Sequence, residues 1–184
     1  EMAFLIETFE SAPFDIIDGD RGKAYPKQHE FRPSGHCLFL SAANVTKTGF
    51  DLASGQFVDE QKDAQLRKGK LRRHDVVLTT RGTLGNSAFY DDEVPYDHVR
   101  INSGMVILRC DPSKIQPKYL YAYLRSAIFH GQVERMRSGA AQPQLPIRDM
   151  KRIELPLPSP TQQERLVEVV SAYDDLIENN RRRV

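Results

Sequence analysis

The sequence has no apolar run that approaches the length of a transmembrane helix. Spanning a bilayer takes about 18 consecutive apolar residues, and the apolar stretches in this chain of 184 residues are all much shorter. A basic segment like the one that opens a secretory signal is also missing, because residues 1–14 carry acidic side chains and no lysine or arginine. We therefore expect a cytoplasmic protein with no membrane partner.

Cysteine is scarce, and the histidines lack metal-binding spacing. The two cysteines, Cys37 and Cys110, each lie inside an apolar run, which predicts buried thiols and argues against a disulfide framework or a cysteine-based zinc site. No HExxH or other paired spacing connects the five histidines, which are His29, His36, His74, His98 and His130. The sequence accordingly predicts no metal site.

Motifs of common catalytic sites are absent too. The glycine-punctuated loop 18–23 is not followed by the GK[ST] start of a nucleotide-binding helix, and no GxSxG elbow or methyltransferase motif occurs. One nuclease-like set remains, Asp51 with Glu60 and Lys62, since a metal-dependent nuclease uses carboxylates and a lysine around an attacking water. Because Glu60 and Lys62 fall in a polar, helix-like run, we predict a non-catalytic chain without cofactors. A stand-alone nuclease is the enzyme alternative.

The sequence does contain an uneven distribution of charge. The net charge is only +1, but residues 1–20 carry six acids and no base, whereas residues 67–81 carry six lysines and arginines against one aspartate. Residues 125–152 are again basic. A protein that presents one face to phosphates shows this asymmetry. A protein–protein docking subunit whose basic face meets an acidic partner would show it as well, so charge alone leaves both interpretations open.

Strand and helix patterns mix irregularly, which predicts an α+β fold with a mixed or antiparallel sheet and a few helices. Residues 75–80 and 87–90 form a predicted hairpin whose turn, 81–86, contains glycines that permit positive φ. Further predicted strands are 14–17, 36–40, 101–110 and 152–157, with 2–9 as either strand or helix.

Three helices are predicted in the body of the chain, over 59–66, over 147–150 and from Pro117, which suits a first helical turn. We expect Gly131 to end or kink the helix that opens at Pro117 near Phe129. The apolar face of that helix would comprise Leu120, Leu124, Ile128 and Val133.

The chain changes character at Pro156, Pro158 and Pro160, whose spacing disfavours both a helix and a strand ladder. This predicts a globular domain over residues 1–155, a proline-rich joint over 156–160 and a long spacer helix over 161–184. Thr161 and Glu164 match a capping box at the start of the helix. Since no glycine stop signal precedes Val184, we expect the helix to be truncated there.

One apolar stripe runs along this helix and suits two roles, folding back on the body or pairing with a second helix as a coiled coil. Its residues are Leu166, Val169, Val170, Tyr173, Leu176 and Ile177. Heptad-like spacing favours pairing, because a polar residue in the seam fixes the register. The predicted seam comprises Leu166, Val170, Tyr173, Ile177 and Asn180.

Polar loops supply the side chains that a DNA-reading surface needs, since lysine and arginine hold phosphates, amides pair with adenine, and arginine pairs with guanine. The candidates for phosphate contacts are Arg21, Lys23, Lys27, Lys47, Arg67, Lys70, Arg72 and Arg73. The candidates for base reading are Asn44, Thr46, Arg81, Thr83, Asn86, Gln142 and Gln144. Asparagine and threonine beside glycines are also common turn formers, so a purely structural role stays open for each of them.

Taken together and in order, several segments resemble the specificity (S) subunits of type I restriction-modification systems. The segments are DGDRGKAYP (18–26), LFLSAANVT (38–46), RKGKL (67–71), LTTRGTLGN (78–86) and IELPLP (153–158) followed by QQER (162–165). They cover nearly the whole chain, and their order is more specific than any one of them.

This resemblance implies a target recognition domain that reads one half of a split site in double-stranded DNA, and a helix that pairs with its counterpart to space the two halves. Methyltransferase (M) and restriction (R) subunits would supply the chemistry. A full S subunit has two recognition domains and two long helices. This chain would therefore be either a half subunit that homodimerises or a fragment that lacks the second half.

Overall fold

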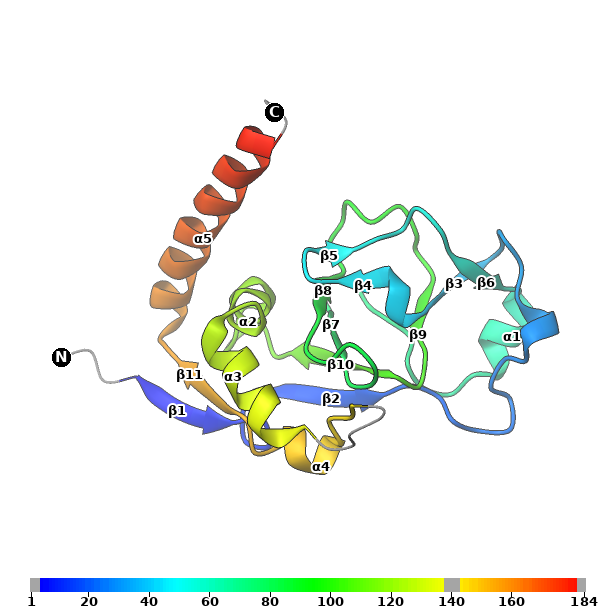
Figure 1. Ribbon diagram of the computed structural model, residues 1–184, viewed down its shortest axis with the longest axis horizontal. Helices are drawn as coiled ribbons and strands as arrows, with labels where there is room; N and C mark the ends of the chain where they lie inside the picture. Colours follow the sequence, from blue (N-terminus) through cyan, green and yellow to red (C-terminus); the bar gives the residue numbers. More distant parts are fainter. Residues whose placement is uncertain (1–3, 138–142, 182–184) are drawn as a thin grey trace.

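The computed structural model describes residues 4–137 and 143–181, which are built around a four-stranded antiparallel sheet (Figure 1). Its strand order is β2-β10-β7-β8. These strands are β2 (Phe14–Asp18), β10 (Met105–Cys110), β7 (Val76–Thr79) and β8 (Ser87–Phe89). Strands β7 and β8 pair as the predicted hairpin, which is therefore confirmed.

A smaller mixed sheet, β6-β3-β9, packs against one face of the four-stranded sheet. Its middle strand, β3 (Cys37–Leu40), runs antiparallel to β6 (Gln56–Val58) and parallel to β9 (Val99–Ile101). The surrounding elements are two 3-10 turns, η1 (Gln28–Glu30) and η2 (Ala42–Asn44), the short strands β4 (Val45–Thr46) and β5 (Gly49–Phe50), and the helix α1 (Glu60–Gln65). Together these elements confirm the α+β class.

The predicted strand 101–110 is wrong as a single element, because it belongs to two sheets. Strand β9 ends at Ile101 and β10 begins at Met105. Between them, the Gly104 N–H donates a hydrogen bond to the side-chain Oδ1 of Asn102 at 2.8 Å, which closes a local turn. This turn moves the chain from the small sheet to the large one.

The segment predicted as one helix from Pro117 is two helices, α2 (Pro117–Leu124) and α3 (Ala127–Met136). Pro117 occupies the first turn as predicted. The chain breaks at Ser126, whose Oγ accepts a hydrogen bond from the Phe129 N–H at 3.2 Å and so caps α3. A further single turn, α4 (Ile147–Met150), lies where it was predicted.

Two details of the helix prediction are wrong. Gly131 does not end a helix, because it lies in the interior of α3. Ile128 does not share the apolar face, since it is 65% exposed while Leu120, Leu124 and Val133 are buried. The new cap at Ser126 restarts the helix, so residues on either side of it do not follow one helical period.

Both faces of the four-stranded sheet are covered. Successive strand residues point to opposite faces, so Leu78 and Leu108 enter the core with α2, α3 and α4. Val77 and Ile107 enter the core with the small sheet. All four side chains are fully buried. The continuous apolar runs of β7 and β10 follow from this two-sided burial.

The N-terminal strand β1 (Leu5–Thr8) pairs antiparallel with β11 (Glu154–Leu157), so the ambiguous segment 2–9 contains a strand. Pro156 lies within β11 opposite Ile6, which corrects the expectation that it excludes a ladder. Its carbonyl accepts a hydrogen bond from the Tyr119 hydroxyl at 2.7 Å. The backbone of Pro156 therefore faces away from β1, where the missing N–H leaves no gap in the ladder.

The C-terminal helix α5 (Pro160–Arg181) begins earlier than predicted. Ser159 and Gln162 form the capping box in place of Thr161 and Glu164. The Ser159 N–H donates to Gln162 Oε1 at 3.0 Å, and the Gln162 N–H donates to Ser159 Oγ at 3.4 Å. Proline fits the first helical position, so only residues 158–159 connect strand and helix.

The base of α5 is fixed to the body, whereas its apolar stripe is not covered. Gln163, fully buried, accepts from the Gln116 N–H at 2.8 Å and donates to the Lys114 carbonyl at 3.1 Å. Arg125 pairs with Asp174 further along. The helix then projects away from the sheets (Figure 1). The exposed large apolar residues on it are Leu166, Val169, Val170, Tyr173, Leu176 and Ile177.

These exposures contradict the alternative in which the stripe folds back on its own domain. Asn180 is exposed as well. No helix in the described part of the chain is long and apolar enough to cross a membrane.

We predict that Gly131→Ala stabilises the protein, because glycine in a helix interior costs about 0.5–1 kcal/mol relative to alanine. An added Cβ would meet only the Arg135 guanidinium at 3.6 Å, an ordinary contact. The change in the free energy of unfolding is measured by urea denaturation. Ser126→Ala is the matched control and should cost about 1 kcal/mol by removing the cap. Destabilisation by Gly131→Ala would contradict this placement of α3.

Candidate functional site

The turn between β7 and β8, residues 80–86, forms the centre of the candidate site. Gly82 and Gly85 have φ of +73° and +79°, as the sequence predicts for this turn. The Thr79 hydroxyl donates to the Thr83 carbonyl at 2.5 Å, and the Asn86 N–H donates to that hydroxyl at 3.0 Å. These bonds keep the turn ordered while Gly82 and Thr83 stay exposed.

On one side of the turn, Arg81 and Gln144 line an open pocket with Arg21. The backbones of Arg81 and Gln144 form a bridge, which places their side chains together. Arg21 forms two hydrogen bonds to Asp18 at 3.1 Å and one to the Ser103 carbonyl at 3.1 Å. Within the described residues, the Arg81 guanidinium has no hydrogen bond or ion pair. It is therefore available to a ligand.

The loop that carries Arg21 is held against the turn at 102–104 by a close approach that only glycine allows. A Cβ on Gly19 would lie 2.3 Å from the Asn102 carbonyl oxygen. The Thr80 N–H donates to the Gly104 carbonyl at 2.8 Å, which joins the same turn to the hairpin. Loop 18–23 and the hairpin tip therefore share one continuous surface.

Asp20 extends this surface toward a second pocket, which Lys23 and Arg67 line. Its carboxylate accepts from the backbone N–H groups of Gly22 and Arg67 at 2.7 Å each and of Lys68 at 3.3 Å. Burial raises the pKa of Asp20, but these backbone bonds outweigh it and the pKa is lowered. The ionised carboxylate thus fixes the loop, and Lys23 and Arg67 are exposed.

On the other side of the turn, Lys47 lines a third pocket with Asn86, Arg125 and His130. Lys47 lies in the tight β4–β5 connection and is exposed. Arg125 already pairs with Asp174, with N–O distances of 2.7 and 2.9 Å. The hairpin tip is therefore flanked by cations on both sides.

We call this region the hairpin-tip surface. Its members combine exposed or half-buried cations with polar side chains around one turn. They are Arg21, Lys23, Lys47, Arg67, Arg81, Thr83 and Gln144.

Two predicted base readers, Asn44 and Asn86, lie inside the protein instead. Asn44 is 3% exposed, and its amide nitrogen donates to the carbonyls of Asp51 at 3.0 Å and Ser54 at 2.7 Å. Asn86 is 8% exposed and donates to the Val45 carbonyl at 3.0 Å. Both amides hold loops in place, which is the structural role that the sequence left open.

Two predicted phosphate ligands are likewise occupied. Arg73 donates to the carbonyls of Asp91 at 2.6 Å and Val94 at 3.0 Å, pairs with Asp97 at 2.7 Å, and lies over the Tyr90 ring at 4.4 Å. It therefore holds the acidic loop 91–97 in place. Lys70 pairs with the carboxylate of Asp63.

The remaining predicted residues lie outside the hairpin-tip surface. Arg72 is exposed but precedes β7, at the end opposite the hairpin tip. Lys27 is exposed beside η1. The Thr46 hydroxyl bonds within its own turn, to Thr48 and to the Gly49 carbonyl. Gln142 lies outside the described residues.

The structure does not support the nuclease alternative, because two of its residues are exposed to solvent and the third is paired elsewhere. Asp51 and Glu60 are exposed, and Lys62 pairs with Glu30 at 2.7 Å. Among the described residues, the group of metal-ligating side chains that lies close together is His36, Asp63 and His98, which includes none of them. Sequence spacing could not reveal this group, since its members are far apart in the chain.

These observations are consistent with a family assignment. A family model described as the type I restriction modification DNA specificity domain matches residues 14–184. The chain belongs to this family. The resemblance given by the ordered motifs is thereby confirmed. The prediction of a non-catalytic chain agrees with the names of the curated relatives, which are specificity subunits.

The chain is similar to longer proteins. It is 26% identical over 144 residues to the type I restriction enzyme EcoBI specificity subunit of Escherichia coli, covering 76% of this chain and 29% of that protein. It is 32% identical over 107 residues to the type I restriction enzyme MjaIX specificity subunit of Methanocaldococcus jannaschii, covering 58% and 23%. The chain thus spans less than a third of either relative.

One solved structure with the same fold comes from work on the complex assembly and conformational transition of the type I R-M system. It aligns with a TM-score of 0.72 over 99% of this chain and 41% of that chain, at 17% identity.

We predict that Asn86→Ala destabilises the fold rather than changing which base is read. The substitution leaves the buried Val45 carbonyl without its partner, and an unsatisfied buried group costs about 1–3 kcal/mol. Urea denaturation measures the loss. Thr83→Ala, at the exposed tip, is the control and should change stability by less than about 0.5 kcal/mol. Equal stability of wild type and Asn86→Ala would contradict the assignment.

Proposed function

We propose that this chain is a target recognition domain that reads one half of a bipartite DNA site through the hairpin-tip surface. The observation that supports this most is the ordered turn at 80–86, exposed at its tip and flanked by cations, in a member of a DNA specificity family. Thr83 is exposed at the tip, and Arg81 and Gln144 line an open pocket beside it. A partner subunit would perform the chemistry.

We assign two kinds of DNA contact to this surface, contacts to phosphates and contacts to base edges. Lys23, Lys47 and Arg67 line the pockets around the tip and hold phosphates, which positions the duplex without reading it. Arg81 and Gln144 lie together and suit base edges, because arginine pairs bidentately with guanine and glutamine with adenine. Arg21 is anchored by Asp18 and serves the phosphates at the border between the two groups.

Replacing a base-reading residue should relax specificity at one position. The target half-site is first selected from a randomised duplex library by the wild-type chain. Arg81→Ala should then lose about 1–3 kcal/mol of discrimination at one base pair of that site, measured by competition binding. Equal losses on the selected and scrambled duplexes would assign Arg81 to the phosphates. Binding without any sequence preference would favour a basic docking face instead of a DNA reader.

Replacing a phosphate-holding residue should weaken binding to every duplex and reduce its salt dependence. Each lost phosphate contact lowers the slope of log affinity against log salt by about 0.9. We expect this for Lys47→Ala and Arg67→Ala in salt titrations of duplex binding. Arg72→Ala is the matched control, because Arg72 is exposed at the opposite end of β7. A slope change for Arg72→Ala alone would place the DNA on the other end of the sheet.

We also propose that α5 pairs with a second such helix and so spaces two recognition domains. The exposed stripe supports this, because Tyr173 at 65% and Ile177 at 50% would otherwise remain in water at a hydrophobic cost. The second helix belongs either to another copy of this chain or to further residues of a longer one. The assembled pair would direct methyltransferase and restriction subunits to the bipartite site.

Pairing is tested by the double substitution Tyr173→Glu and Ile177→Glu. We expect the wild-type chain to form dimers at high concentration and the double variant to be monomeric, as measured by light scattering after size exclusion. Glu168→Lys is the control, since Glu168 is exposed on the same helix but off the stripe. Identical masses for wild type and double variant, with dimers in both, would refute the seam.

A further inference from the structure

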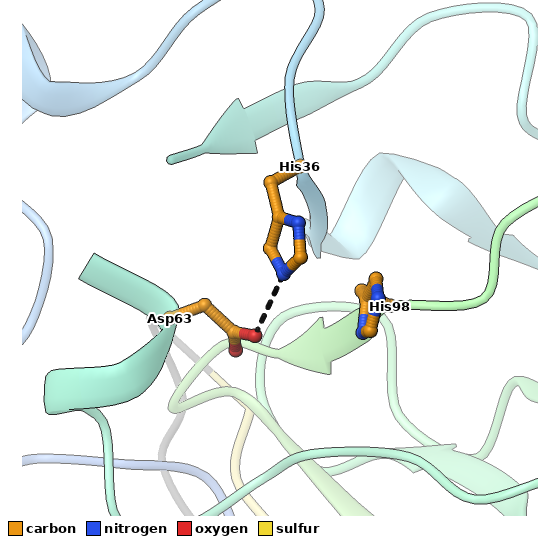
Figure 2. Close-up of side chains that lie close together, drawn as sticks. All are labelled: His36, Asp63 and His98. Atoms are coloured by element: carbon orange, nitrogen blue, oxygen red, sulfur yellow. Dashed lines mark ion pairs between the residues drawn. The ribbon is translucent and has the colours of Figure 1, made fainter. Parts of the chain in front are cut away.

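Two histidines and an aspartate meet beside α1, outside the hairpin-tip surface (Figure 2). His36 Nε2 lies 3.4 Å from Asp63 Oδ2. The ligand atoms of His36, Asp63 and His98 all lie within 4.8 Å of one another. The two imidazole rings are stacked, with centroids 4.1 Å apart. Nothing in the proposed DNA-reading role uses this cluster.

The fold brings these residues together through the parallel pairing of two strands. His36 immediately precedes β3, and His98 immediately precedes β9. The Leu38 N–H donates to the His98 carbonyl at 2.9 Å, which fixes the register of the two strands at this end. Helix α1 places Asp63 against the pair from the side. Residues far apart in the chain therefore share one rigid position.

We propose that His36, Asp63 and His98 form a zinc-binding site in which water completes the coordination. Two nitrogens and one oxygen are a donor set that zinc accepts, and a tetrahedral ion is held about 2.0–2.2 Å from each ligand. Ligands at those distances lie about 3.3 Å apart, which the separation of His36 and Asp63 already matches.

His98 can close the remaining distance by rotation. Its side chain is not buried, and within the described part of the chain its ring nitrogens make no hydrogen bond or ion pair. Cys37 is next to His36 in the chain, but it is not part of the group whose ligand atoms lie within 4.8 Å of one another. The site is therefore built from two imidazoles and one carboxylate.

The surroundings of Asp63 both support and limit metal binding. Arg100 donates to Asp63 Oδ1 at 2.5 Å and orients the carboxylate, as partners of metal ligands commonly do. Lys70 pairs with Oδ2, the oxygen that faces the histidines. The Lys70 side chain is 38% exposed and could rotate into solvent, but its charge competes with the ion. Removing that charge should tighten metal binding.

A bound ion would brace the basic segment of the candidate DNA surface. Arg100 also donates to the carbonyls of Lys68 at 2.8 Å and Leu66 at 3.1 Å. These residues flank Arg67 in the chain. Zinc bound to Asp63 would therefore also fix the position of Arg100. Arg100 in turn would hold the backbone on both sides of Arg67.

The test is a zinc titration of the untagged, metal-depleted chain by calorimetry, with cobalt absorption as a second probe of the same site. We expect one ion per chain and an increased thermal midpoint on binding. His98→Ala should weaken zinc affinity at least 100-fold without changing the circular dichroism spectrum, because the side chain is not buried. His29→Ala is the matched control, since His29 is exposed and outside the cluster, and it should bind as the wild type does.

Lys70→Met separates a metal site from a purely structural ion-pair cluster. In a metal site it should tighten zinc binding several-fold, because the ion no longer competes with a cation for Asp63. The proposal is overturned if the wild type binds no stoichiometric zinc, if binding survives His98→Ala, or if Lys70→Met weakens binding.

Discussion

Burial of the central sheet on both faces constrains the rest of this structure. Val77 and Ile107 point into one core, and Leu78 and Leu108 point into the other. Each fully buried side chain of this size contributes about 1.5–3 kcal/mol, so neither strand can shift register by one residue without exchanging the two faces. The ends of β7 and β10 are therefore fixed in space. The hairpin tip and the turn at 102–104 lie at those fixed ends.

Electrostatics sorts the many cations of the chain into two groups. Arg73 and Arg100 are surrounded by carbonyl and carboxylate oxygens, and Arg109 pairs with Asp75 at 2.7 Å. Losing such a buried partner leaves an uncompensated charge, so these residues maintain the fold. Lys47, Arg67 and their neighbours on the hairpin-tip surface keep their charges in water. Only that second group can release counterions from DNA at little structural cost.

Residues with strong local conformational preferences made much of the fold predictable. The hairpin followed from Gly82 and Gly85 between apolar runs, and the start of α2 followed from Pro117. The rest depended on tertiary contacts. The turn after Ile101 requires Asn102 to bond back to Gly104, and the sequence around it reads as one strand. Asn44 and Asn86 have the composition of a reading loop, yet burial turns their amides inward.

The sequence predicted the type of site but not which individual residues form it. The ordered motifs identified the family, and Arg81 with Gln144 does face one pocket as a recognition pair would. The phosphate candidates were too numerous, because charge in the sequence does not show whether a carbonyl cluster or an aspartate already holds it. His36 and His98 could not be paired from the sequence, since their meeting depends on the parallel register of β3 and β9.

The central claim is that DNA lies against the hairpin tip and not against the opposite end of the sheet. Photocrosslinking tests it most directly, with benzoylphenylalanine placed at position 83 in one protein and at position 72 in another. Both positions are exposed. With the selected duplex, we expect crosslinks to bases from position 83 and none from position 72. Crosslinks from position 72 with none from position 83 would contradict the account.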